Sequence, residues 1–397
     1  MGIVNIILFL LVFLNSTCII KLQASNEYFS AVEANNQFSL NFLYEVEKGT
    51  TGNIFFSPFS IINAFGMVYE GANSKTAEEI KRVFHLSPVE EDRLKGFLIL
   101  NDLLTFEKSN CKLNISNAYW VQENYRLLKN YTEKIEKYYK GEAYNVNFIK
   151  EPEKAAARIN QWADKKTQGK IKKFLEEGDV NRDTRIVLTN AVYFKGIWQF
   201  QFDKKATKPD DFWLDDRRST KVQMMQLLDK EFPYAETQDF QIIKLPYECQ
   251  NLAILILLPK HTKQTKRITE TDLNEYQKLL KKQKIDVFLP RFKVESTIDL
   301  SGVLKNLGIN AAFNPEFADF SRMTGNKDLF ISKAIQKSYI EVNEEGTEAA
   351  AVTGIVMKIT AARPEIKKVF RADHPFLFFI TEETSGLILF AGKIHQP

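Results

Sequence analysis

The chain has 397 residues, of which 44% are hydrophobic and 26% charged, a composition typical of a soluble globular protein. The formal net charge of +4 is too small to indicate a nucleic-acid partner or an anionic membrane surface. The 31 Phe and 14 Tyr exclude intrinsic disorder, while 3 Cys and 4 His exclude a disulfide scaffold and leave little for a metal site, so we expect no metal and no cofactor.

The N-terminal segment, residues 1–24, is predicted to be a secretory signal peptide. The apolar run Ile6–Leu14 is too short to span a bilayer, and Leu22-Gln23-Ala24 resembles a cleavage site before Ser25. No Lys or Arg precedes the run, so a buried N-terminal helix or an uncleaved anchor is the alternative. Cleavage predicts a secreted, extracellular mature chain, residues 25–397.

Sequons and cysteines of the mature chain give two further expectations. The sequons begin at Asn114 and Asn130. Asn130 begins a charged, helix-like stretch and is expected to be exposed and glycosylated, whereas Asn114 is expected in a strand, where modification is less favoured. Nothing in the sequence pairs Cys111 with Cys249, so two free buried thiols are predicted.

The first part of the chain has mainly helical patterns. Apolar spacing predicts an amphipathic helix over residues 27–48, and Asn53–Ser60 predicts a short strand that runs into Ser-Pro, followed by a helix through Tyr69. Further helical patterns start at Ser74 and cover residues 88–107 and 130–140.

Strand patterns come mostly later, at residues 115–121, 185–194, 252–258, 285–294 and 376–392. Those near 185 and 252 are almost continuously apolar, as is typical of strands covered on both faces. This order of elements predicts the α+β class, and no linker divides the chain.

Common catalytic motifs are absent from the sequence. It has no G-x-S-x-G, H-E-x-x-H, C-x-x-C or phosphate-binding glycine loop. No catalytic residue is therefore assigned, the chain is not predicted to be an enzyme, and His374 is interpreted as structural. The basic runs at 165–166, 170–173 and 281–284 are interpreted as solvated faces, with a polyanion site such as one for a glycosaminoglycan as the alternative.

Residues 344–364, EEGTEAAAVTGIVMKITAARP, are ambiguous between helix and strand. Thr347 could cap a helix, but Ala350 stands where a capping box needs Glu or Gln. In a strand, one face would carry only uncharged side chains, beginning with Thr347, Ala349 and Ala351, and both charges would lie on the other. The segment could therefore be a loop in one state and a sheet strand in another.

Five spaced motifs resemble those of the serpin family, from about residue 27 to the C-terminus. They are Asn53–Ser60, Thr189–Trp198, Glu344–Ala351, Phe370–Ile380 and Phe390–Lys393. The resemblance implies an α+β serpin fold with three β-sheets, eight or nine helices and an exposed reactive-centre loop at about 344–364. It implies a single serpin domain over residues 25–397, expected to be a monomer.

The resemblance also implies a secreted suicide inhibitor of serine proteases. The protease attacks the loop as a substrate, and the cleaved loop inserts into the large sheet and traps the covalent acyl-enzyme. The hinge implied by the motif comprises Glu344, Gly346, Thr347, Glu348, Ala349, Ala350 and Ala351. No bulky or proline residue interrupts it, so inhibition is expected, with a non-inhibitory carrier or chaperone as the alternative.

Matching motifs assign a structural switch, made of Ser57, Ser60, Asn190, Trp198, Arg291 and Gln336. The serines and Asn190 are implied to form a polar cluster where the large sheet opens, with Gln336 in a place where the family often has His. Trp198 is implied to pack at the top of the sheet, and Arg291 to pair with Glu344. The alternatives are a helix cap for the serines, ordinary core for Trp198 and a solvated ion pair worth under about 1 kcal/mol.

The reactive bond is placed by counting along the loop. The usual family spacing from Glu344 gives Thr360-Ala361, and counting back from Pro375 gives a position one residue later. Small side chains there indicate an elastase-like protease with a shallow pocket. Lys358 and Arg363 are the trypsin-like alternatives, the first with an unusually short inserting segment and the second with proline after the cleaved residue.

Overall fold

The computed structural model of the chain describes residues 27–104, 107–108, 111–249, 251–261, 266–347 and 368–397. The predicted signal peptide and the predicted reactive bond lie outside the described residues. Among the described residues, no helix is both long and apolar enough to cross a membrane.

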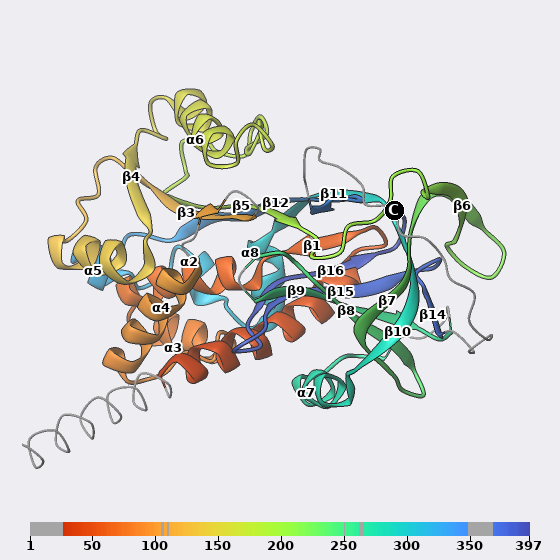
Figure 1. Cartoon of the computed structure of the whole chain (residues 1–397). Coiled ribbons are helices and arrows are strands. Elements are labelled where there is room, and N and C mark those ends of the chain that lie inside the picture. Colours follow the sequence, from red (N-terminus) through yellow and green to blue (C-terminus); the bar gives the residue numbers. More distant parts are fainter. Residues whose placement is uncertain (1–26, 105–106, 109–110, 250, 262–265, 348–367) are drawn as a thin grey trace, which may run out of the picture.

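The helices between residues 27 and 104 pack as a layer beside the strands (Figure 1). A helix over residues 27–49 precedes strand β1 (Ile54–Phe56) and the almost completely buried helix α2 (Pro58–Gly71). The Ser57 side chain accepts a hydrogen bond from the Ser60 amide, which caps α2, and a proline starts its first turn. The remaining helices are α3 (Ser74–Val83), α4 (Glu90–Leu104), α5 (Lys129–Tyr139), α6 (Pro152–Lys166), α7 (Glu270–Leu279), α8 (Leu300–Leu307) and α9 (Ser321–Thr324).

A seven-stranded sheet lies between α6 on one side and α2, α3 and α4 on the other (Figure 1). Its strand order is β11-β12-β13-β5-β3-β2, and β4 pairs with β3. The strands are β2 (Glu107–Lys108), β3 (Cys111–Gln122), β4 (Glu142–Val146), β5 (Ile186–Ile197), β11 (Phe292–Asp299), β12 (Ile331–Val342) and β13 (Gly346–Thr347). Because helices cover both faces, the continuous apolar pattern predicted near 185 is confirmed as a central strand.

Strand β5 sends its side chains alternately to two hydrophobic clusters. Leu188, Val192 and Phe194 lie in the main core, on the α2 side of the sheet. Val187 and Ala191 lie in a smaller cluster with the apolar residues of α6. The large sheet therefore has a buried face on each side.

The other strands form a nine-stranded network with the order β1-β16-β15-β9-β8-β7-β10-β14, and β6 pairs with β7. Its remaining strands are β6 (Lys208–Trp213), β7 (Ser219–Glu236), β8 (Phe240–Pro246), β9 (Leu252–Pro259), β10 (Lys281–Pro290), β14 (Lys368–Arg371), β15 (Phe376–Glu382) and β16 (Ile388–Ile394). The 18-residue β7 pairs with β6 and β10 but reaches β8 only over Tyr234–Glu236. It thereby joins two of the three expected sheets into one network, and the α+β serpin fold class is confirmed.

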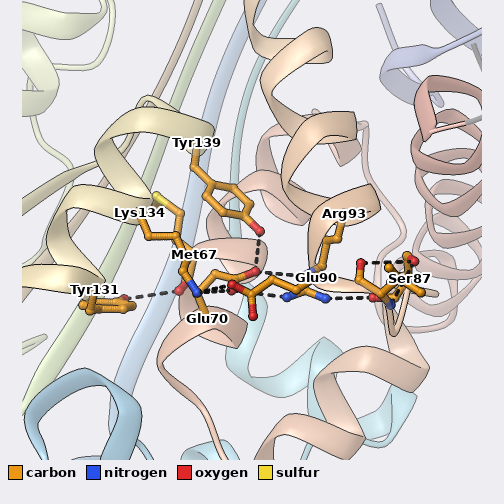
Figure 2. Close-up of polar contacts among 9 residues, drawn as sticks. Met67, Glu70, Ser87, Glu90, Arg93, Tyr131, Lys134 and Tyr139 are labelled. Atoms are coloured by element: carbon orange, nitrogen blue, oxygen red, sulfur yellow. Dashed lines mark hydrogen bonds and ion pairs between the residues drawn. The ribbon is translucent and has the colours of Figure 1, made fainter. Parts of the chain in front are cut away.

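A buried ionic network joins α2, α4 and α5 (Figure 2). Glu70, with a side chain 2% exposed, accepts hydrogen bonds from Arg93 Nε and from the Tyr139 hydroxyl, both at 2.8 Å. Lys134 Nζ lies 3.4 Å from the second oxygen of Glu70 and 2.7 Å from Glu90. Each charge thus has an opposite charge close by, the condition under which buried ions are tolerated.

The cysteine prediction is corrected by the structure. Cys249 is disulfide-bonded, so the prediction of two free thiols is wrong. With three cysteines at irregular spacing the sequence carries no pairing signal, since pairing depends on the approach of the two Cα atoms in the fold.

Candidate functional site

The candidate site is the seam between β5 and β12, the line along which these two strands meet. Over most of its length they are parallel neighbours, and after a register shift between Ile331 and Lys333 they pair continuously up to Tyr339 opposite Tyr193. Beyond that pair they part, and β13 lies between them, antiparallel to both, with Thr347 opposite Val342 and Gly196. A longer strand in this position would require the parallel ladder to open.

A tight turn, Asn343–Gly346, brings the chain from β12 back into the seam. The Asn343 side-chain oxygen accepts hydrogen bonds from the amides of Glu345 (3.0 Å) and Gly346 (3.3 Å). Gly346 has φ of +155°, and a Cβ there would lie 2.0 Å from the carbonyl oxygen of Gly196. Only glycine fits this conformation and this close approach.

An ion pair fixes the start of this turn. Arg291 Nε lies 2.8 and 2.9 Å from the two carboxylate oxygens of Glu344, and the Thr207 hydroxyl donates to the same carboxylate. Burial raises the pKa of Glu344, but the hydrogen bonds from Arg291 and Thr207 outweigh it and hold that pKa below its usual value. The solvated-pair alternative does not hold, because the Glu344 side chain is 2% exposed, although that of Arg291 is 43% exposed.

We call the end of the seam that holds the turn Asn343–Gly346 and β13 the hinge end. Charged side chains of both signs surround it. Glu345 pairs with Lys204 next to the Glu344–Arg291 pair. An open pocket of about 510 Å³ lies beside them, and Lys293 and Glu341 also line it. The turn that leads into β13 is therefore held by two neighbouring ion pairs.

Trp198 lies buried at the hinge end and is bonded to the turn itself. Its indole nitrogen donates to the Asn343 carbonyl and its backbone amide to the Glu345 carbonyl, both at 2.9 Å. Its ring stacks on Tyr247, with ring centres 4.6 Å apart. The Tyr247 hydroxyl in turn lies 2.8 Å from the hydroxyl of Thr347. Sequence analysis did not identify Tyr247, since a tyrosine after an apolar strand carries no signal of its own.

A polar cluster lies further along the seam, where β5 and β12 still pair. Gln336 Nε2 donates across the seam to Asn190 Oδ1 (2.6 Å) and to the Ser57 carbonyl (3.0 Å), and the Ser57 amide donates to Gln336 Oε1 (3.0 Å). Asn190 Nδ2 and the Ser60 hydroxyl both donate to Asn117 Oδ1, at 2.6 and 3.2 Å. The four residues singled out from the sequence lie together, and Asn117 on β3, which was not predicted, joins them.

The predicted glycosylation sites differ in their surroundings. Asn130 is exposed in the first turn of α5. Asn114 is half-buried in β3, and its Nδ2, the atom a glycan would occupy, lies 3.3 Å from the Lys166 carbonyl oxygen. The remaining predicted site residues lie outside the described residues: Glu348, Ala349, Ala350, Ala351, Lys358, Thr360, Ala361 and Arg363.

Both ring nitrogens of His374 have partners. Nδ1 lies 2.8 Å from Asp373 Oδ1, and Nε2 lies 2.6 Å from the Pro259 carbonyl oxygen. This geometry agrees with a structural role, because neither nitrogen is available to a reacting group. In the described part of the chain no group of three or more His, Cys, Asp or Glu side chains could hold a metal ion.

Comparison with known proteins gives a consistent result. Residues 33–397 match a family model described as serpin, serine protease inhibitor. The chain is 39% identical over 371 residues to an uncharacterized serpin-like protein of Thermococcus kodakarensis, covering 92% of this chain and 85% of that protein. It is 38% identical over 377 residues to leukocyte elastase inhibitor A of Mus musculus, covering 92% and 98%. The crystal structure of Serpin48 from the insect Tenebrio molitor matches with a TM-score of 0.82 at 32% identity, covering 93% of this chain and 98% of that one.

These matches correct the bare prediction that the chain is not an enzyme. That prediction was drawn from missing motifs. The matches replace it with a positive result, similarity to a family described as serine protease inhibitors, in which one relative is named leukocyte elastase inhibitor A. The five motifs, the fold and the family model agree over nearly the whole chain. The chain belongs to the serpin family.

Proposed function

We propose that the chain is a secreted suicide inhibitor of a serine protease. The catalytic serine of the protease attacks the reactive bond, forms an ester with the carbonyl carbon and releases the peptide nitrogen on the C-terminal fragment. Insertion of the cleaved loop then competes with hydrolysis of that ester by water. The observation that carries the proposal is the hinge residue Thr347, which lies as a β-residue paired with both β5 and β12.

Strand geometry gives the insertion its driving force. A strand that enters antiparallel to β5 and β12 gains a hydrogen-bond ladder on each side, whereas only the parallel ladder between them is lost. The hydrogen bond between Gln336 and Asn190 must part as the strand passes. We therefore expect insertion of a strand between β5 and β12 to be energetically favourable and to require cleavage of the reactive bond.

The proposed target is an elastase-like protease that cleaves Thr360-Ala361. Small side chains at this bond fit a shallow pocket, and one relative is named leukocyte elastase inhibitor A. Cleavage after Lys358 or Arg363 would instead indicate a trypsin-like protease.

The test is incubation of residues 25–397 with elastase, chymotrypsin and trypsin, followed by denaturing gels and the mass of the released C-terminal peptide. A covalent complex together with a peptide that begins at Ala361 would support both the mechanism and the target class. Peptides that begin at Ile359 or Pro364 would change the target class alone. Cleavage without a complex would contradict inhibition and favour a carrier or chaperone. Protease with a blocked catalytic serine is the control and should give no complex.

Secretion is part of the proposal. The apolar run Ile6–Leu14 and the cleavage-like segment before Ser25 support it, and so does the disulfide at Cys249, since disulfides persist in oxidising compartments. Expression in a secreting host should yield protein in the medium that begins at Ser25 and carries a glycan on Asn130. Retention inside the cell with an intact N-terminus would contradict this part.

A further inference from the structure

The side chains of Tyr247 and Thr347 are in polar contact, and Thr347 belongs to the short hinge strand β13. The two hydroxyl oxygens lie 2.8 Å apart and the contact is buried. Thr347 is fully enclosed between β5 and β12 before any cleavage, and Tyr247 is also buried. The hydrogen bond thus connects the hinge residue that pairs with both β5 and β12 to a side chain that belongs to neither of these strands.

Tyr247 is held in place independently of the hinge. Its ring stacks on Trp198 at an interplanar angle of 10° and meets Phe194 edge-on at 5.2 Å. Its backbone amide donates to the Leu252 carbonyl (2.9 Å). A Cβ on Gly196 would lie 2.9 Å from the Tyr247 ring, so the glycine lets the ring approach β5 beside Thr347. The phenol is therefore a fixed group and the hinge is the part that can move.

Because the Tyr247 hydroxyl is buried, whether it has a hydrogen-bond partner depends on the position of Thr347. Burial raises the pKa of Tyr247, so the phenol is neutral and its hydroxyl needs a hydrogen-bond partner. If Thr347 withdrew from the seam, its own hydroxyl would gain water, but the Tyr247 hydroxyl would stay among the rings of Trp198 and Phe194. A buried hydroxyl without a partner is unfavourable. The contact thus favours the state in which Thr347 is inserted.

We propose that Tyr247 is a positioning residue that holds Thr347 in the seam of the uncleaved protein, so that insertion of the cleaved loop starts from a strand already in register. The geometric part of this inference stands alone; its kinetic consequence rests on the proposed inhibitory function. Loss of one net hydrogen bond should reduce the equilibrium ratio of inserted to withdrawn hinge by about five- to tenfold. Slower insertion would let water release more acyl-enzyme, so more inhibitor would be consumed as substrate.

The experiment compares Tyr247→Phe, Thr347→Val and the double variant with the wild type by hydrogen–deuterium exchange of residues 343–347 in uncleaved protein. Each single variant should exchange about five- to tenfold faster, and the double variant no faster than the faster single one. Thr347→Ser keeps the hydroxyl and should exchange slowly. Tyr131→Phe is the matched control: its hydroxyl is also buried, 2.6 Å from that of Tyr119, but lies on α5.

Unchanged exchange in both single variants, or equally fast exchange in Tyr131→Phe, would overturn the proposal. Thr347→Val decides the matter if Tyr247→Phe does not fold. The number of inhibitor molecules cleaved per covalent complex is the second measurement, and it should rise for Tyr247→Phe and stay near wild type for Tyr131→Phe. If the wild type forms no complex with any protease, the proposed function fails, while the exchange result still decides whether Tyr247 holds the hinge.

Discussion

Replacing Glu70 with Gln is expected to destabilise the protein far more than the same change at Glu90, although Lys134 lies close to both carboxylates. The Glu70 side chain is 2% exposed and that of its partner Arg93 is 5% exposed, whereas Glu90 is 59% exposed. Glu70→Gln leaves the guanidinium buried beside a neutral amide, a loss of about 3–5 kcal/mol in the free energy of unfolding. Glu90→Gln breaks an exposed pair worth under about 1 kcal/mol.

Urea unfolding followed by circular dichroism at neutral pH would measure both costs. The midpoint should fall clearly for Glu70→Gln and hardly at all for Glu90→Gln. Combining Glu70→Gln with Arg93→Met should recover part of the loss, because no unpaired charge then stays buried. A cost for Glu70→Gln within about 1 kcal/mol of that for Glu90→Gln would refute the reasoning, since it would mean that the Arg93 charge finds water or another partner.

Three further outcomes are expected. Thr347→Arg should turn the inhibitor into a substrate, because a guanidinium would have to enter the closed seam; a wild-type yield of covalent complex would contradict this. Thr360→Arg should shift the preference toward trypsin-like proteases, and an unchanged preference would move the reactive bond elsewhere. Burial lowers the pKa of His374, but hydrogen bonds to Asp373 and the Pro259 carbonyl raise it more, so the pKa lies above its usual 6.5. The stabilisation by protonated His374 is full below pH 6.5 and is lost as the pH rises through the pKa of the folded state. The urea midpoint of the wild type should therefore fall between about pH 6 and about pH 8. An equally large fall in His374→Gln would contradict the assignment to His374.

Local patterns were enough to predict most of the regular elements. The predicted helix over 27–48 covers residues 27–49 in the structure, and the Ser-Pro start of the next helix is the cap and first turn of α2. The apolar runs near 185 and 252 are β5 and β9, both buried almost throughout. These predictions depend on side-chain period and on capping, which neighbouring residues determine.

Contacts between distant segments were not predictable in the same way. Asn117 and Tyr247 belong to the site only because β3 pairs with β5 and Tyr247 forms a bridge with Trp198, both over long sequence distances. The disulfide at Cys249 and the burial of Glu344 have the same origin. The motifs singled out the residues that share this site, but hydrogen bonds, burial and the inserted position of Thr347 follow from packing alone.

The residues at the two ends of the seam have opposite effects: those at the hinge end favour an inserted strand, and those at the polar cluster hold β5 and β12 together. At the hinge end, the missing Cβ of Gly346 lets its backbone approach that of Gly196, the missing Cβ of Gly196 makes room for the Tyr247 ring, and Tyr247 favours the inserted Thr347. Farther from the hinge, between Ile331 and Tyr339 of β12, the parallel ladder and the hydrogen bond from Gln336 to Asn190 oppose separation of β5 and β12. If the proposed insertion mechanism holds, the barrier to spontaneous insertion lies at the polar cluster and productive insertion starts at the hinge end. Changes at the hinge end should alter how acyl-enzyme partitions, and changes at the cluster should alter how long the uncleaved state survives.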